Sequence, residues 1–337
     1  MNPWLLEVIT VRNGSHDAGE RRSLSRDVER GLLVRLRQGA YVERGAFEAM
    51  PPEDQHLVRL RALAAVSDAP PVVSHWSAGV VLRLPVLRRR LGMLHTTVEE
   101  RRGRGQEGVS AHLFPVSETE LTLVGDLVVT GVPRTIVDIA GAAPFDEGVM
   151  AADAALRSGV PREVLEDAII AAGPRRAQRR IEHVVAFAHP GAESAAESGS
   201  RTLMMRLGVE PPVLQWPVPL ADGTTAYLDF LFPAPRVGGE ADGDVKYLDP
   251  LMAPAGAGQA VVREKRREDE VRTRVAGLAR WGWRESRELD LLRRVLHRVG
   301  VLAAAPRATL ADYCAAPRSA RPRFVARRPP SPATRSG

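Results

Sequence analysis

The sequence predicts a protein of mixed fold class, α+β or α/β, that is built from several domains. Three observations indicate this. A helical segment precedes a basic hairpin near the N-terminus, short strands alternate with helices in the middle of the chain, and the last third has the element order α-β-β-β-α-β-α. A chain of 337 residues is too long for one small domain, so we expect domains over residues 1–45, 46–190 and 191–300 and a tail over 301–337.

The first predicted domain consists of two helices and a hairpin within residues 5–45. Leu24, Val28 and Leu32 recur at helical spacing, and the residues that follow alternate between apolar and basic side chains up to a turn at Gly39. A helix followed by a basic hairpin is typical of a winged helix-turn-helix. The segment is therefore predicted to be a DNA-binding head.

Four arginines of this head are candidates for contacts with DNA. Arg26 and Arg30 on the second helix would meet bases or phosphates, and Arg35 and Arg37 on the hairpin would meet phosphates. Acids lie between the two helical arginines, and such a pattern fits a solvated surface helix as well. Both interpretations stay open on the sequence alone.

The second predicted domain mixes strands and helices. Its elements are an amphipathic helix at 55–67, short strands within 71–130 around a short helix in SHWSAGVVLRL, and a run of helices over 133–188. Breaks that contain glycine separate these last helices, at Gly141, Gly159-Val160-Pro161 and Gly173-Pro174. The eight histidines of the chain show no spacing typical of metal ligands, so we interpret His75 as a structural residue.

The third predicted domain follows a loop that starts at His189. Ser194 is a typical helix cap, Gly208 a typical helix end, and Asp222-Gly223 a strong hairpin signal. The expected elements are, in order, a helix at 195–207, strands around 213–220 and 226–232, a third strand from Arg236, a charged helix at 261–280, the strand-like segment WRESREL and a helix at 289–299.

Composition favours an intracellular protein. No stretch approaches the roughly 18–20 apolar residues that a membrane helix needs, and the first residues lack the charged region and cleavage site of a signal peptide. The single cysteine, Cys314, excludes an internal disulfide. We therefore expect a cytoplasmic protein without a membrane partner.

The excess positive charge lies entirely in the tail. Residues 306–337 contain seven arginines and one acid, which accounts for the whole net charge of +6. Such a tail either adds salt-dependent affinity for phosphates or is a solvated terminus. Lys246 and Lys265 are the only lysines among 47 basic residues. Unless this is chance, they serve roles that arginine cannot, because the pKa of a lysine shifts on burial.

Several stretches resemble known families. GLLVRLRQGAYV, SHWSAGVVLRLP and VTGVPRTIVDIA resemble abortive-infection (AbiEi-type) antitoxin domains of actinobacteria. AAESGSRTLMMRLG, LDFLFP, VGGEADGDVKY and REKRRED resemble the very-short-patch-repair-like nuclease domain often fused to them. Together they cover roughly residues 20–290. The resemblance implies a regulator-like head and a C-terminal restriction-endonuclease-like, or PD-(D/E)XK, domain of order αβββαβ, in which acids on two adjacent strands bind Mg²⁺ and activate water against a phosphodiester.

Asp229 and Glu240 are the main candidates for catalysis and for metal binding. Asp229 lies inside the apolar strand Tyr-Leu-Asp-Phe-Leu-Phe, where a carboxylate is costly to bury unless a cation or several donors compensate it. Glu240 follows eleven residues later, which suits the next strand of a hairpin. Two adjacent carboxylates would provide the oxygen ligands that Mg²⁺ prefers. The alternatives are a structural salt bridge for Asp229 and an edge-strand acid for Glu240.

Four further residues complete the candidate site. Asp242 is either a turn residue or a third metal ligand. The resemblance implies a lysine two residues after Glu240, where Asp242 stands, so Lys246 or Lys265 would reach the scissile phosphate instead; Lys265 is also a candidate nucleic-acid contact. Glu197 is the third residue of its predicted helix, which makes it a capping residue, a metal-site acid or both.

Two functions follow from these patterns. The first is a DNA-binding protein with a Mg²⁺-dependent, endonuclease-like C-terminal domain. The second is a catalytically silent, antitoxin-like repressor of a toxin–antitoxin or phage-defence system. DNA is the expected partner in both, and a cognate toxin is a further partner in the second.

Overall fold

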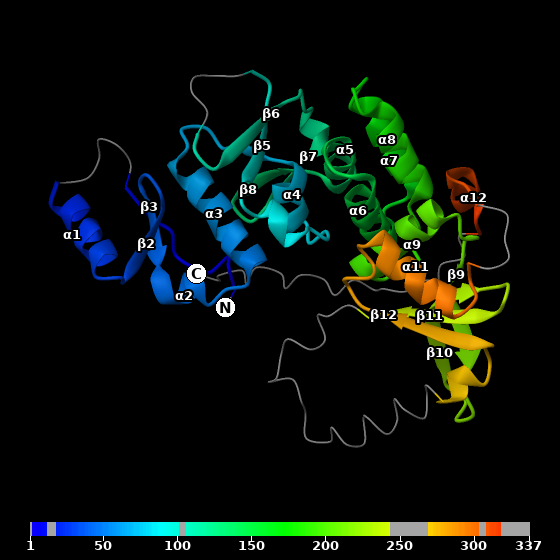
Figure 1. The fold of residues 1–337 in the computed structure, drawn as a ribbon. Helices are drawn as coiled ribbons and strands as arrows, with labels where there is room; N and C mark the ends of the chain where they lie inside the picture. Colours follow the sequence, from blue (N-terminus) through cyan, green and yellow to red (C-terminus); the bar gives the residue numbers. More distant parts are fainter. Residues whose placement is uncertain (1, 12–17, 101–105, 243–268, 303–307, 318–337) are drawn as a thin grey trace. The chain divides into compact units, whose positions relative to one another are not determined.

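The computed structural model of the chain describes residues 2–11, 18–100, 106–242, 269–302 and 308–317. These residues form a mixed α+β fold with three β-sheets (Figure 1), which confirms the predicted mixed class. The chain divides into two compact units. Unit 1 contains Met1–Ala151 and Arg162–Val185, and unit 2 contains Ala152–Pro161 and Ala186–Gly337.

The N-terminal sheet of unit 1 is antiparallel and follows α1 (Ala18–Glu29). Its strand order is β1 (Ile9–Thr10), β3 (Ala40–Glu43), β2 (Leu33–Arg37), and α2 (Arg44–Glu48) comes next. Gly39 lies in the β2–β3 turn with a φ of +79°, and a Cβ atom there would lie 2.6 Å from the Val11 carbonyl oxygen. Only glycine fits this turn, so the predicted hairpin and its turn residue are confirmed.

The helix predicted before α1 is wrong for the described residues 2–11. Ile9 pairs with Tyr41 and Thr10 pairs with Ala40, so this segment supplies a third strand of the sheet. Its β-branched residues pack well on a pleated surface and give little support to a helix.

The second sheet of unit 1 has five strands in the order β6-β5-β4-β8-β7. These are β4 (Val72–Val73), β5 (Leu94–Val98), β6 (Val109–Leu113), β7 (Leu121–Val124) and β8 (Leu127–Thr130). A hydrophobic core joins the sheet to α3 (Pro52–Val66) and α4 (His75–Val81) through Leu60, Val73, Ala78 and Val129. The predicted strands within 71–130 and both helices are confirmed.

Four helices follow the second sheet. They are α5 (Val132–Ala142), α6 (Phe145–Arg157), α7 (Arg162–Ala171) and α8 (Gln178–Phe187). Gly159 and Gly173 lie between helices, as predicted, and both have positive φ. Gly141 lies inside the last turn of α5, so its prediction as a break is wrong; Ala143 and Pro144 separate α5 from α6. None of the helices in the described ranges is both long and apolar enough to cross a bilayer.

Unit 2 is built around a four-stranded sheet of order β12-β11-β10-β9. Its elements are α9 (Ala195–Leu207), β9 (Val213–Pro219), β10 (Thr225–Phe232), β11 (Val237–Ala241), β12 (Gly277–Trp281), α11 (Leu289–Arg298) and α12 (Leu310–Ala315). The strands β9, β10 and β11 are antiparallel neighbours, and β12 runs parallel to β11.

One face of this sheet packs against α9. The Trp281 indole N–H donates a hydrogen bond to Ser200 Oγ of α9 at 2.8 Å, and the Phe230 and Trp281 ring centroids are 5.4 Å apart. Gly239 lies under these rings, where a Cβ atom would come within 2.8 Å of Trp281. The close packing of sheet and helix therefore requires glycine at this position of β11.

The predicted charged helix over 261–280 is wrong in its last part. The described helical residues of this segment end at Arg272, and Gly277–Trp281 forms β12. Ala279 and Trp281 are buried on one face, whereas Arg280 between them is exposed, as expected for a strand. WRESREL, predicted as strand-like, forms turns that lead into α11. Residues 243–268 and the tail from residue 318 lie outside the described residues.

Candidate functional site

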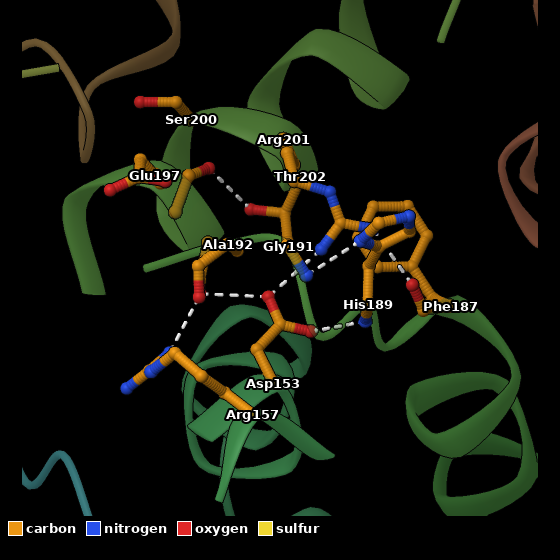
Figure 2. A network of polar contacts seen from close by, with 12 residues as sticks. Asp153, Arg157, Phe187, His189, Gly191, Ala192, Glu197, Ser200, Arg201 and Thr202 are labelled. Atoms are coloured by element: carbon orange, nitrogen blue, oxygen red, sulfur yellow. Dashed lines mark hydrogen bonds and ion pairs between the residues drawn. The ribbon is translucent and has the colours of Figure 1, made fainter. Parts of the chain in front are cut away.

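A buried polar network fixes the start of α9 in unit 2 (Figure 2). The Asp153 carboxylate accepts hydrogen bonds from the His189 backbone N–H at 2.7 Å and from the Ser198 hydroxyl at 2.8 Å. Arg201 pairs with the same carboxylate at an N–O distance of 2.8 Å. Because Ser198 and Arg201 lie on α9, these bonds hold its first turns, including Glu197, in place.

Glu197 is both a capping residue and a buried acid. Ser194 Oγ accepts a hydrogen bond from the Glu197 backbone N–H at 3.1 Å, and a Glu197 carboxylate oxygen accepts one from the Glu193 N–H at 2.8 Å. The Glu197 side chain is 4% exposed. Burial, together with the negative charge of Asp229, raises its pKa to about 8. Capping and proximity to a second acid therefore coexist at this residue.

Asp229 lies beside Glu240 on neighbouring strands. The β10–β11 register pairs Phe230 with Gly239, and Asp229 and Glu240 are the next residues on the two strands. One Asp229 oxygen accepts a hydrogen bond from the Ala241 backbone N–H at 2.8 Å. The pKa of Asp229 is raised to about 6, mainly by burial. The hydrogen bond from the Ala241 N–H lowers this pKa, and the negative charge of Glu240 raises it further.

Glu240 has a cationic partner. Arg280 lies opposite Glu240 in the β11–β12 register and binds its carboxylate at an N–O distance of 2.5 Å. Asp242 is exposed at the end of β11, and its backbone N–H donates to the Trp281 carbonyl oxygen at 2.9 Å. The charge of Asp242 also raises the pKa of Asp229.

The structure thus places three of the predicted site residues near Asp229 of β10: Glu197 from α9, and Glu240 and Asp242 from the end of β11. Within the described residues, no three histidine, cysteine, aspartate or glutamate side chains are arranged to hold a metal ion together. The other two predicted site residues, Lys246 and Lys265, lie outside the described residues.

The four arginines of the predicted DNA-binding head differ in their surroundings. Arg26, Arg30 and Arg35 are exposed, and Arg30 lies 4.0 Å from Asp27. Arg37 is half-buried, and its guanidinium donates to Gln106 Oε1 at 2.7 Å. Burial lowers the pKa of Arg37. An incoming phosphate would therefore compete with a protein acceptor for Arg37.

Unit 1 brings together four histidines that spacing did not single out. The His75 and His112 rings stack with centroids 3.5 Å apart, and His95 Nδ1 lies 2.9 Å from His112 Nε2. Burial lowers the pKa of His75 to about 2 and the pKa values of His56 and His95 to about 4. The four residues come from α3, α4, β5 and β6, so no motif in the sequence could have revealed the cluster.

The family resemblances rest on short motifs of the sequence. No model of a known protein family matches the chain, and no curated protein was found to be similar to it. The antitoxin-like and nuclease-like functions therefore stay predictions, to be judged on the geometry of the residues themselves.

Replacing Glu197 with glutamine is expected to stabilise unit 2 at pH 8 by about 4 kcal/mol. The folded pKa of Glu197 lies above its unfolded value, so the native state keeps a proton that the unfolded state loses. Stability is therefore lost as the pH rises from about 4.5 to about 8. Urea denaturation at pH 6 and pH 8.5 would measure the effect. Glu210→Gln, at an exposed position, is the control, and equal pH dependence in both variants would contradict the assignment.

Proposed function

We propose that the chain is a cytoplasmic, DNA-associated protein whose unit 2 hydrolyses phosphodiester bonds with Mg²⁺, as a restriction-endonuclease-like domain. The main support for this proposal is the pair of acids Glu197 and Asp229. Both are largely buried, and their negative charges repel each other. A divalent cation would remove this repulsion. Mg²⁺ keeps several of its waters and needs only one or two protein carboxylates, which fits a pair of acids.

Each acid has a distinct role in this proposal. Asp229 and Glu240 would supply oxygens from adjacent strands, and the exposed Asp242 would add negative charge at the same end of the sheet. Glu197, with its raised pKa, holds or releases a proton near neutral pH. Lys246 would contact the scissile phosphate. A bound Mg²⁺ ion would lower the pKa of water and neutralise the charge that develops on the phosphate.

The decisive experiment is incubation of the pure full-length protein with supercoiled plasmid and Mg²⁺. We expect the wild-type protein to nick the plasmid, and the variant Asp229→Asn with Glu240→Gln to nick it at least about a hundredfold more slowly. Loss of residues that merely hydrogen-bond to a metal ligand already lowers activity by about 10- to 100-fold, and loss of the ligands themselves should lower it at least as much. Glu210→Gln should nick at the wild-type rate. Nicking that survives the double substitution would come from contamination and would refute the site.

The ion pair between Arg280 and Glu240 favours a second candidate, an antitoxin-like repressor without catalysis. In this reading a protein cation already neutralises Glu240 and leaves it unavailable to a metal. The head, formed by α1 and the β2–β3 hairpin as a winged helix-turn-helix, would then bind DNA through Arg26, Arg30, Arg35 and Arg37, and unit 2 would bind a cognate toxin. Absence of nicking, with a gel shift that weakens in Arg35→Ala with Arg37→Ala, would support this candidate.

A further inference from the structure

Gln215 in β9 has a backbone conformation that regular strands do not adopt. Its φ is +50°, whereas residues in antiparallel strands have a φ of about −140°. This left-handed region costs free energy for residues other than glycine. Residues held in it collect at functional sites, where the surrounding structure fixes them. The contacts of Gln215 indicate what this strain maintains.

Gln215 lies next to the acids of the candidate site. The β9–β10 register pairs the residues on either side of Gln215 with the residues on either side of Asp229, so Gln215 lies opposite Asp229. Glu240 lies beside Asp229 on the third strand, and Arg280 lies opposite Glu240 on the fourth. One residue from each strand thus forms a polar row across the sheet of unit 2: Gln215, Asp229, Glu240 and Arg280.

The side chain of Gln215 connects the polar row to α9. Its amide Nε2 donates a hydrogen bond to Glu197 Oε2 at 3.3 Å. The same oxygen accepts the Glu193 backbone N–H at 2.8 Å. Two donors therefore hold Glu197 Oε2, whereas Glu197 Oε1 accepts no hydrogen bond from the described residues. This arrangement sets the rotation of the carboxylate and leaves one of its oxygens available.

Asp229 is bound in the same one-sided way. Its Oδ2 accepts the Ala241 N–H at 2.8 Å, and its Oδ1 accepts no hydrogen bond from the described residues. Asp229 Oδ1 and Glu197 Oε1 both reach solvent, since neither is a fully buried atom without a partner. Each of the two acids thus has one oxygen that is held by the protein and one that a ligand can approach.

Gln215 is a neutral donor, unlike the cation at the other end of the polar row. Arg280 pairs with Glu240 and offsets its negative charge. An amide instead donates a hydrogen bond and adds no positive charge. Gln215 can therefore orient Glu197 without weakening the attraction of Glu197 and Asp229 for a divalent cation.

We propose that Gln215 is a positioning residue for the divalent-cation site of unit 2. Its amide holds Glu197 through Oε2, so that Glu197 Oε1 and Asp229 Oδ1 stay free together for the cation and its waters. This inference rests on the proposed function of unit 2. The strained backbone of Gln215 is retained because the amide reaches Glu197 from this conformation.

The variant Gln215→Gly, made in the full-length protein, separates the side chain from the strained backbone. Glycine adopts positive φ at little cost, so resistance to urea should equal or exceed that of the wild type. Loss of the amide should weaken Mg²⁺ binding about tenfold and slow plasmid nicking about tenfold, as for other residues that orient a metal site. Calorimetric titration with MgCl₂ in the absence of DNA measures the binding independently of catalysis.

Arg236→Gly is the matched control. Arg236 also has a positive φ, +66°, but it is exposed directly before β11, at the end of that strand away from Glu240. This variant should bind Mg²⁺ and nick plasmid as the wild type does.

Four results would overturn the assignment of Gln215. Wild-type binding and nicking in Gln215→Gly would reject it while the proposed function stands. An equal loss in Arg236→Gly would mean that any change of backbone strain disturbs the site. Weaker Mg²⁺ binding accompanied by lower resistance to urea would give Gln215 a structural role instead. A wild-type protein that neither binds Mg²⁺ nor nicks plasmid would reject the proposed function and this inference together.

Discussion

Asp153→Ala is expected to destabilise unit 2 by about 3–5 kcal/mol. The Asp153 side chain is fully buried, and the Arg201 side chain beside it is 3% exposed. Truncation would leave the Arg201 guanidinium in the interior without a carboxylate to balance its charge. It would also remove the acceptor of the His189 N–H and of the Ser198 hydroxyl. An uncompensated charge in a low-dielectric interior is the reason for the large effect.

Urea denaturation at pH 7.5, followed by hydrogen exchange in the α9 segment, would measure this loss. Asp290→Ala is the matched control, since Asp290 is 75% exposed and pairs with Arg293 on the surface of α11. An exposed pair of this kind contributes at most about 1 kcal/mol. If Asp153→Ala cost no more than Asp290→Ala, the network of Figure 2 would not be what holds α9 in place.

Lowering the pH from 6.5 to 4 is expected to destabilise unit 1 by roughly 3 kcal/mol for each of His56 and His95. Burial lowers both folded pKa values to about 4, below the unfolded value near 6.5. Between pH 6.5 and pH 4 the histidines bind protons in the unfolded state but not in the native state. The free energy of unfolding therefore falls as the pH falls. The bonds of His56 agree with a neutral ring: one ring nitrogen faces the Leu91 carbonyl oxygen at 3.1 Å and the other faces Ser77 Oγ at 2.8 Å.

The measurement is a series of urea denaturations between pH 7.5 and pH 4.5. His56→Gln should reduce the loss of stability across this range, because one of the histidines with a lowered pKa is gone. His183→Gln, at an exposed position of α8, should follow the wild-type pH dependence. A wild-type stability that stays flat between pH 6.5 and pH 4.5 would contradict the burial of neutral histidines.

Local signals in the sequence predicted much of the fold correctly. Ser194 and Gly208 define the ends of α9 as expected, because a cap and a left-handed glycine act within one turn of the helix. Gly39 and Gly223 both have positive φ in the hairpin turns where they were predicted. The alternation of side chains along β2 and β10 likewise depends only on neighbouring residues.

The wrong predictions concern segments whose partners lie far away in the chain. Residues near 277–281 carry a helical pattern of apolar side chains, but their backbone pairs with β11, forty residues earlier in the chain. Ile9 and Thr10 become a strand because β3 offers a free edge. Such pairings depend on which strand edges still have unpaired backbone groups once the rest of the sheet has formed. A local sequence pattern does not indicate which edges these are.

By itself, the sequence determined the mixed fold class, the positions of most helices and hairpins, and the adjacency of Asp229 and Glu240, since each follows from turns, caps and spacing within one hairpin. Only the tertiary structure decided that Arg280 pairs with Glu240, that four histidines meet in unit 1, and that Arg175 and Asp138 line a cavity. These groups come from elements that are distant in sequence, and their pKa values and unmet hydrogen bonds arise from burial, which depends on the packing of the whole unit.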